Sequence, residues 1–199
     1  EDCLYLNVWK PAGDKINLPV VFYIHGGSLT TGQSWWQDYN GESYAKKDVI
    51  FVTFSYRLGA LGFYADENLA RESANNTTGM YGFLDQVKAL EWVNKNIKSF
   101  GGDPNKITIA GESAGSSSVN AMCVSPLTKG LFRYAISESS SITGKKPPHS
   151  YKDFADAIKQ GKTLRDELGV SSPVDLRKVP AEKIANTSTQ YGTLNAMTN

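Results

Sequence analysis

The sequence predicts an α/β fold with a mostly parallel sheet and helices on both faces. Apolar, β-rich runs recur along the chain, and segments with helical spacing lie between them. Most of these runs are continuous rather than strictly alternating, which is typical of strands covered on both faces. Because strands that alternate with helices form βαβ units, we expect a parallel arrangement.

Five segments are predicted as strands. The first, "LYLNVW" at residues 4–9, alternates large apolar and smaller side chains. The others are near-continuous apolar runs at residues 19–27, 48–59, 106–111 and 134–139.

Three segments are predicted as helices, and the longest covers residues 83–100. Its apolar residues step by three or four, and Gly101, Gly102 and Pro104 end it. A second helix is expected just after Ser113 and up to Pro126, and a third over residues 151–168. Residues 65–82 are interpreted as a long polar connection. The expected inner faces of the first and third helices are Phe83, Val87, Leu90, Val93, Ile97 and Phe100, and Phe154, Ala155, Ile158, Leu164 and Leu168.

The bulk properties fit one soluble domain. The 199 residues suffice for a sizeable core, 40% of them are hydrophobic, and the formal net charge is +1. This balance gives no electrostatic reason to expect nucleic acid or an anionic membrane as partner, and no apolar run is long enough to span a bilayer. Because Glu1 begins at a strand edge and the last residues form no closing element, residues 1–199 are expected to be part of a longer domain.

The two cysteines differ in context. Cys123 lies in the apolar stretch "VNAMCVSP" and is predicted to be a buried small hydrophobe, while Cys3 follows an acidic pair. The two have no metal-ligand spacing, and nothing in the sequence requires them to pair with each other. No metal ion or organic cofactor is expected.

The stretch "ITIAGESAG" carries the strongest chemical signal. Gly111, Ser113 and Gly115 fit the pattern G-x-S-x-G, directly after a β-rich run and before a helix-compatible stretch. In such a strand-to-helix turn the serine takes a strained backbone conformation, and a Cβ at either flanking position would collide with a neighbouring element. The turn lifts the hydroxyl from the carboxyl edge of the sheet, so Ser113 is the candidate nucleophile.

A serine nucleophile also needs donors for the oxyanion. The segment "YIHGGSL" ends the second predicted strand in glycines, whose N–H groups can approach a substrate oxygen without obstruction. Ala114, which follows the serine, supplies another N–H.

Several motifs resemble one family. The segments "EDCLYLNVWKP", "PVVFYIHGGS", "DVIFVTFSYRLGALGF", "GMYGFLDQVKALEWVNKNIKSFGGDPNKITIAGESAG" and "LFRYAISESS" follow in the order and spacing of the type B carboxylesterases, and they cover roughly the first two-thirds of the chain. This group of carboxylesterases, cholinesterases and related lipases has the α/β-hydrolase fold. The resemblance therefore implies an incomplete α/β-hydrolase domain that acts on small-molecule esters.

The resemblance also implies roles for individual residues. Ser113 corresponds to the acyl-accepting nucleophile, and the N–H groups of Gly27, Ser28 and Ala114 correspond to a three-part oxyanion hole. Glu112 and His25 are expected to organise the site rather than react. The remaining implications are a structural role for Asp85 and Gln86, and for Cys3 a disulfide partner further upstream.

Two positions depart from the family pattern. The third glycine after His25 is replaced by Ser28, whose Cβ would narrow the pocket while its amide remains. The usual "QSG" reads Glu138, Ser139, Ser140, which questions a supporting role for Ser139.

The base and the acid of a triad are not evident in this sequence. In the family they follow the nucleophile in the order acid, then histidine, beyond residue 199. Of the two histidines, His25 precedes the nucleophile and His149 lies in a loop, where we expect it to be solvated. Residues 1–199 alone are therefore expected to show little turnover, and to fold poorly because a sheet edge is exposed.

Other interpretations stay open at this stage. The same fold serves as a non-catalytic adhesion module, although the intact Ser113 favours an enzyme, and a lipase or peptidase is a further alternative. Trp35, Trp36 and Tyr39 fit either a substrate gorge or core and rim packing. A paired Cys3 and the N-glycosylation sequons favour a secreted or extracytoplasmic location; the sequons are at Asn75, Asn76 and Asn186.

Overall fold

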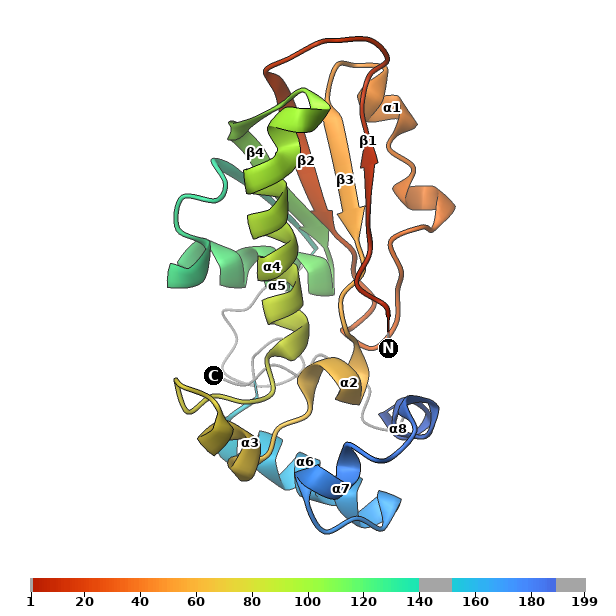
Figure 1. The fold of residues 1–199 in the computed structure, drawn as a ribbon, viewed down its shortest axis with the longest axis vertical. Helices are drawn as coiled ribbons and strands as arrows, with labels where there is room; N and C mark the ends of the chain where they lie inside the picture. Colours follow the sequence, from red (N-terminus) through yellow and green to blue (C-terminus); the bar gives the residue numbers. More distant parts are fainter. Residues whose placement is uncertain (1, 140–151, 189–199) are drawn as a thin grey trace.

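The computed structural model describes residues 2–139 and 152–188. Its centre is a five-stranded sheet in the order β1-β3-β2-β4-β5 (Figure 1). Strand β1 is antiparallel to β3, and the other neighbours are parallel. The predicted α/β class is thus confirmed. The strands are β1 (Leu6–Trp9), β2 (Leu18–Ile24), β3 (Ile50–Phe54), β4 (Gly102–Glu112) and β5 (Tyr134–Glu138).

Most strand boundaries differ from the prediction, and two of them differ by four residues or more. The run at residues 48–59 is strand only as far as Phe54, because Gly59 already begins the short helix α2 (Gly59–Phe63). Strand β4 begins earlier than expected, at Gly102, where Leu18 of β2 pairs with it across an irregularity in the register.

The longest predicted helix is present as α4 (Tyr81–Asn96) followed by a 3-10 turn, η2 (Ile97–Phe100). Gly101 ends it in the left-handed conformation, as expected. Its predicted apolar residues face the core, where Leu90, Val93 and Ile97 are fully buried. Asp85 is buried on the same helix and forms a two-pronged ion pair with Arg57, which supports the structural role expected for Asp85.

Helix α5 (Ala114–Val124) follows Ser113, as predicted, but the prediction for Cys123 is wrong. The thiol is exposed. Val119 and Met122 are buried on the inner face of the helix, and Cys123 is one residue further on, about 100° around the helix axis. Val124 is exposed beside it.

The segment at residues 65–82 is not the featureless connection that was predicted. It contains helix α3 (Glu67–Glu72), and Asp66 caps this helix by accepting a hydrogen bond from the Asn68 N–H. The sequons at Asn75 and Asn76 lie in the exposed turn that follows. A one-turn helix, α1 (Glu42–Ala45), was also not predicted.

The third predicted helix is α6 (Phe154–Leu168), with two shorter helices after it, α7 (Pro173–Leu176) and α8 (Ala181–Ser188). Its expected inner face was wrong at the start, because Phe154 and Ala155 are exposed. The face is set instead by contact with the chain after α2: a Cβ on Gly161 would lie only 1.9 Å from the Ala65 carbonyl oxygen. The buried residues of α6 are Ala157, Gly161, Leu164 and Leu168.

The main core lies between the sheet and helices α4 and α5. It contains alternate residues of the central strands, including Phe22, Val52 and Ile109, together with the inner faces of both helices. On the other face, α1 covers the sheet through Tyr44, whose ring stacks on Phe51 at a centroid distance of 4.4 Å.

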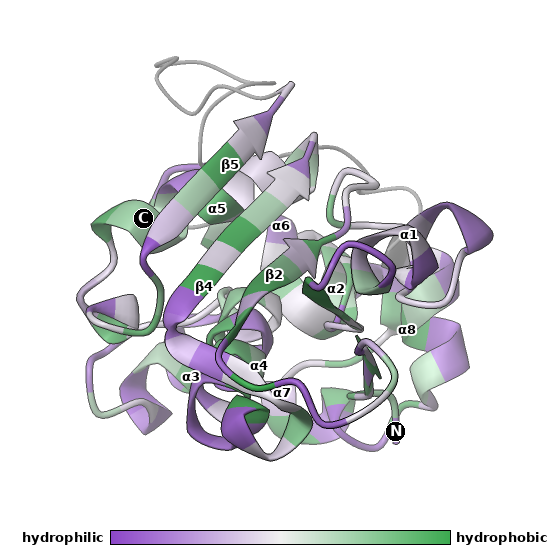
Figure 2. Cartoon of the chain, turned by 90° about the horizontal axis from the view of Figure 1, so that it is seen from above, coloured by the Kyte–Doolittle hydropathy of each residue, from purple (hydrophilic) through white to green (hydrophobic). Residues whose placement is uncertain are grey.

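Strand β5 departs from the prediction that the strands are covered on both faces. Within the described part of the chain β5 is an edge strand, and its five residues are all exposed, although Figure 2 shows hydrophobic residues along β5 as along β2 and β4.

The parallel strands β2 and β3 point towards the end of the molecule where α2, α3 and α6–α8 lie (Figure 1). The loops at their carboxyl ends therefore lie between the sheet and this helical layer, where α/β proteins commonly bind ligands. Within the described residues, no helix is long and apolar enough to cross a membrane.

Candidate active site

Ser113 occupies a strained turn between β4 and α5. Its backbone angles are φ 54° and ψ −121°, a conformation that residues with a Cβ rarely adopt. The turn is held on both sides, since the Ser113 N–H donates to the Glu138 carbonyl (2.9 Å) and the Ser117 N–H donates to the Ser113 carbonyl (3.1 Å). The serine is half-buried, so the hydroxyl-bearing residue is accessible from solvent.

The two glycines that flank this turn are required by packing. A Cβ on Gly111 would lie 2.5 Å from the Gly115 carbonyl carbon, and a Cβ on Gly115 would lie 2.0 Å from the Ile24 carbonyl oxygen. Both separations are far below a van der Waals contact. The predicted collision at both flanking positions is thus confirmed, and it brings the start of α5 directly against the end of β2.

The loop after β2 lies beside the serine. Ile24 and Gly111 are register partners on the parallel strands β2 and β4, so the two chains leave the sheet together. A Cβ on Gly26 would lie 2.8 Å from the Glu112 carbonyl oxygen and 3.2 Å from the Ser113 Cβ. Gly26 was not singled out from the sequence, although its place in the paired glycines after His25 was the available signal.

Residues 27–31 form a tight turn with an unusual backbone. Gly27, Ser28 and Leu29 all have positive φ angles, of 101°, 56° and 61°. The N–H groups of Thr30 and Thr31 both donate to the Gly27 carbonyl at 3.0 Å. The turn is anchored because Leu29 is fully buried and its carbonyl accepts a 2.7 Å hydrogen bond from the Gly59 N–H.

Three N–H groups in this region have no acceptor among the described residues. They belong to Gly27, Ser28 and Ala114, the positions expected to form the oxyanion hole. Gly27 and Ser28 are half-buried, whereas Ala114 is fully buried as the first residue of α5. Uncommitted amides beside a helix N-terminus favour a negatively charged oxygen.

His25 lies beneath this loop and is only 2% exposed. Its Nδ1 is 2.8 Å from the Gly26 carbonyl oxygen, so this nitrogen carries the proton and donates. The Tyr56 hydroxyl donates to the His25 carbonyl (2.8 Å), and the two rings stack at 4.4 Å. Burial lowers the pKa of His25, which keeps the ring neutral. Tyr56 is a second supporting residue that the sequence analysis missed.

Glu112 is exposed and pairs in register with Glu138 of β5. Burial raises the pKa of Tyr23 to about 12, and the charges of Glu112 and Glu138 contribute to that shift. Both carboxylates therefore lie close enough to Tyr23 to disfavour its ionisation.

The aromatic residues after the oxyanion loop differ in packing and exposure. Tyr39 packs between Trp36 and Tyr23, with ring centroids at 5.9 Å and 5.2 Å. Trp35 and Trp36 are 65% and 42% exposed, so core packing does not account for them.

The remaining candidates are less defined. His149 lies outside the described residues, and Ser139 is exposed with a φ of 59°. Over residues 2–139 and 152–188, no three histidine, cysteine, aspartate or glutamate side chains gather closely enough to hold a metal ion.

A sequence model of the Carboxylesterase family matches residues 1–198. The chain belongs to the carboxylesterase family. The match confirms the family resemblance that the sequence motifs indicated. It is also consistent with the strained serine turn that packs against the glycine loop.

Individual relatives of the chain are esterases by name. The chain is 46% identical over 143 residues to a fumonisin B1 esterase of Sphingopyxis macrogoltabida, covering 71% of this chain and 26% of that protein. It is 40% identical over 198 residues to a juvenile hormone esterase of Tribolium castaneum, covering 96% and 32%. The crystal structure of a Geobacillus stearothermophilus carboxylesterase superposes with a TM-score of 0.85 at 36% identity, covering 99% of this chain and 41% of that chain. This carboxylesterase chain therefore has the α/β-hydrolase fold and spans about a quarter to two-fifths of these relatives.

Proposed function

We propose that this chain carries the nucleophile and the oxyanion hole of a serine carboxylic ester hydrolase. The observation that carries the proposal is the strained Ser113, which begins α5 at positive φ and packs against a loop whose amides have no acceptor among the described residues. Strain of this kind persists where the surrounding structure enforces it, often at catalytic sites. The named esterases among the relatives support the same reaction class.

The reaction proceeds in two steps. The Ser113 Oγ attacks the ester carbonyl carbon and its proton passes to a base, while the N–H groups of Gly27, Ser28 and Ala114 stabilise the oxyanion. The C–O bond then breaks, the alcohol leaves with a proton, and the acyl group stays on Ser113. Water attacks this acyl-enzyme, releasing the carboxylic acid and restoring the hydroxyl.

His25 and Glu112 have supporting roles in this scheme. His25 donates its Nδ1 proton to the Gly26 carbonyl and is enclosed by Tyr56, so it fixes the loop and is not oriented as a base. The Glu112 backbone packs against Gly26, and this contact fixes the distance between the loop and the serine. The base and its orienting acid are contributed by sequence outside residues 1–199, in the part of the relatives' length that this chain does not span.

Labelling with a fluorophosphonate tests the proposal. The Ser113 Oγ forms a bond to phosphorus, the P–F bond breaks and fluoride leaves, so the full-length protein gains a covalent adduct on the peptide that contains Ser113. The Ser113→Ala variant remains unlabelled and loses hydrolysis of p-nitrophenyl acetate. A matched control is Ser125→Ala, since Ser125 only caps the 3-10 turn after α5 and that variant keeps both properties.

Two results would redirect the proposal. Absence of labelling in a folded protein would favour a non-catalytic binding module of the same fold. Residues 1–199 alone should show little turnover; activity comparable to that of the full-length protein, lost in Ser113→Ala, would instead indicate a base within the chain, with His149 the first to test.

A further inference from the structure

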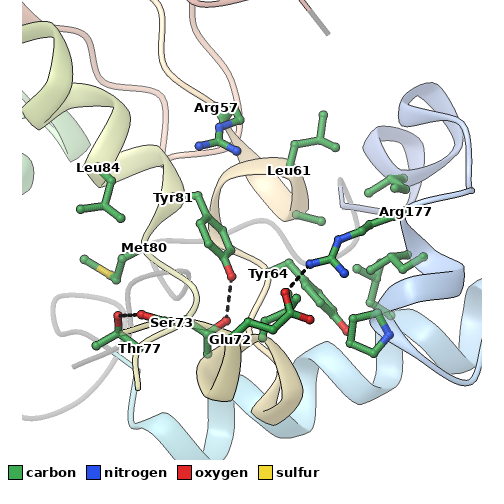
Figure 3. Close-up of a pocket in the computed structure, with 17 residues that line it drawn as sticks. Arg57, Leu61, Tyr64, Glu72, Ser73, Thr77, Met80, Tyr81, Leu84 and Arg177 are labelled. Atoms are coloured by element: carbon green, nitrogen blue, oxygen red, sulfur yellow. Dashed lines mark hydrogen bonds and ion pairs between the residues drawn. The ribbon is translucent and has the colours of Figure 1, made fainter. Parts of the chain in front are cut away.

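A second cavity lies away from Ser113, between α2, α3 and the start of α4 on one side and α6–α8 on the other (Figure 3). Its volume is about 470 Å³, which is in the range of small-molecule pockets. None of the proposed catalytic residues lines it. The cavity is therefore a separate candidate site.

The walls of this cavity are mostly apolar. Leu164, Leu176 and Ile184 contribute from the helical layer and are themselves buried. Leu61 and Leu84 also line the cavity and are 39% and 44% exposed, so part of its apolar lining is open to solvent. A ligand with an alkyl chain would cover this apolar surface.

Among the described residues, three charged groups line the cavity, and two of them are guanidinium groups. Arg57 and Arg177 are cationic, whereas Glu72 is the single carboxylate in the lining. Asp85 neutralises Arg57 from outside the lining, so Arg177, whose partner Glu72 is exposed, is the group that favours an anionic over a cationic ligand.

The two arginines differ in how readily they can exchange their carboxylate partner for a ligand. Arg57 is held by Asp85 through Nε and Nη2 at 2.7 Å and 2.8 Å, and the Asp85 side chain is only 7% exposed. Breaking that pair would leave a buried carboxylate without its partner, so it does not exchange readily. Arg177 pairs with Glu72 at 2.7 Å, but both side chains are more than half exposed. Exposed pairs of this kind are weak.

The pair between Arg177 and Glu72 also bridges the cavity. Figure 3 shows the Arg177 side chain reaching from the α7 side to the Glu72 carboxylate at the end of α3. A ligand carboxylate can replace that of Glu72 on Arg177. The guanidinium can donate two parallel hydrogen bonds to such a carboxylate.

We propose that this cavity binds a linear alkyl monocarboxylate, with its alkyl chain against the leucine walls and its carboxylate on Arg177 in place of Glu72. Such an acid belongs to the class of products released by ester hydrolysis. The site is distinct from the proposed catalytic serine and does not depend on its activity.

Calorimetric titration of the full-length protein with decanoate, below its micelle concentration, tests the site. The protein is first blocked with a fluorophosphonate, or used directly if it does not label, so that product binding near Ser113 is excluded. Arg177→Gln is expected to weaken decanoate binding about tenfold or more, because it removes a charge-assisted hydrogen bond. Glu72→Gln is expected to tighten it several-fold, because it removes the competing carboxylate.

The decisive result is that the two substitutions change the decanoate affinity in opposite directions. Both variants break the same ion pair, so a merely structural role for that pair would move both affinities the same way and overturn the proposal. Lys178→Gln is the matched control, since Lys178 neighbours Arg177 but does not line the cavity, and it should change affinity less than twofold. Binding of decylammonium or decanol as tight as that of decanoate, or no binding of decanoate at millimolar concentration, would also overturn it.

Discussion

The Cα of Gly115 lies so close to Ile24 that a Cβ would stand 2.0 Å from the Ile24 carbonyl oxygen. This contact joins the first turn of α5 to the last residue of β2. It fixes the serine turn and the glycine loop relative to each other through backbone atoms, which cannot repack as side chains do.

Substitution of Gly115 by alanine should therefore be costly. We expect Gly115→Ala to lower the free energy of unfolding by about 3 kcal/mol, at the upper end of the usual cost of overpacking, because the obstructing atom belongs to the backbone. Denaturant unfolding of the full-length protein measures this. Gly169→Ala is the control: its Cβ meets no described residue within 4 Å, and only its φ of 67° is unfavourable, so about 1 kcal/mol is expected. Equal losses for the two variants would refute the packing argument.

Ser28 stands where the family resemblance predicts a glycine, and its φ is 56°. Ser28→Gly should relieve this strain and raise the free energy of unfolding by up to about 1 kcal/mol. The N–H that is proposed to stabilise the oxyanion is retained, so kcat for p-nitrophenyl acetate should stay within about threefold. Ser28→Ala keeps the Cβ and the strain, and it separates their effect from that of the hydroxyl. A loss of stability in Ser28→Gly would count against this view.

The ion pair between Arg57 and Asp85 should contribute to stability. Asp85 is 7% exposed and accepts from the Arg57 backbone N–H as well as from the guanidinium. Because the Arg57 side chain is 39% exposed, breaking this pair costs less than breaking a fully buried pair. We expect Asp85→Asn to lower the free energy of unfolding by about 2 kcal/mol. Glu91→Gln, which breaks an exposed pair with Lys88 on the same helix, should change stability by less than about 0.5 kcal/mol. Unfolding curves that coincide for the two variants would contradict the expectation.

A structural feature can be predicted from the sequence when its cause is local, and it is missed when it depends on contacts between distant segments. The serine turn was predictable because its cause is local: two glycines, a strand before and a helix after. Cys123 and the start of α6 were mispredicted because burial there depends on which neighbour each helix meets. The inner face of α6 follows Gly161 against Ala65, a contact between segments almost a hundred positions apart. The cavity beside Arg177 likewise combines distant segments, so no single motif indicates it.

Gln86 offers a stabilising substitution. Its side chain is fully buried, and neither its Oε1 nor its Nε2 has a hydrogen-bond partner among residues 2–139 and 152–188. A buried amide without partners costs about 1–3 kcal/mol, and an apolar side chain of similar shape removes that cost. We therefore expect Gln86→Met to raise the free energy of unfolding by about 1 kcal/mol. Gln86→Glu should do the reverse because it buries a carboxyl group at the same place. Destabilisation by methionine would mean that the amide has a partner in the full-length protein.

The buried ring of His25 should make stability depend on pH. Its Nδ1 proton is donated to the Gly26 carbonyl, so further protonation must occur at Nε2, which is buried and has no partner in the part of the chain that the structure describes. Burial thus lowers the pKa of His25 below its ordinary value of 6.5. As the pH falls below 6.5, the unfolded state takes up a proton that the folded state does not, so the free energy of unfolding falls by up to about 1.4 kcal/mol per pH unit until the lowered pKa is reached. In denaturant titrations from pH 7.5 to 5, His25→Gln should give a flatter curve than the wild type, because all other titrating groups are shared. Parallel curves would show that His25 is not held neutral by the fold.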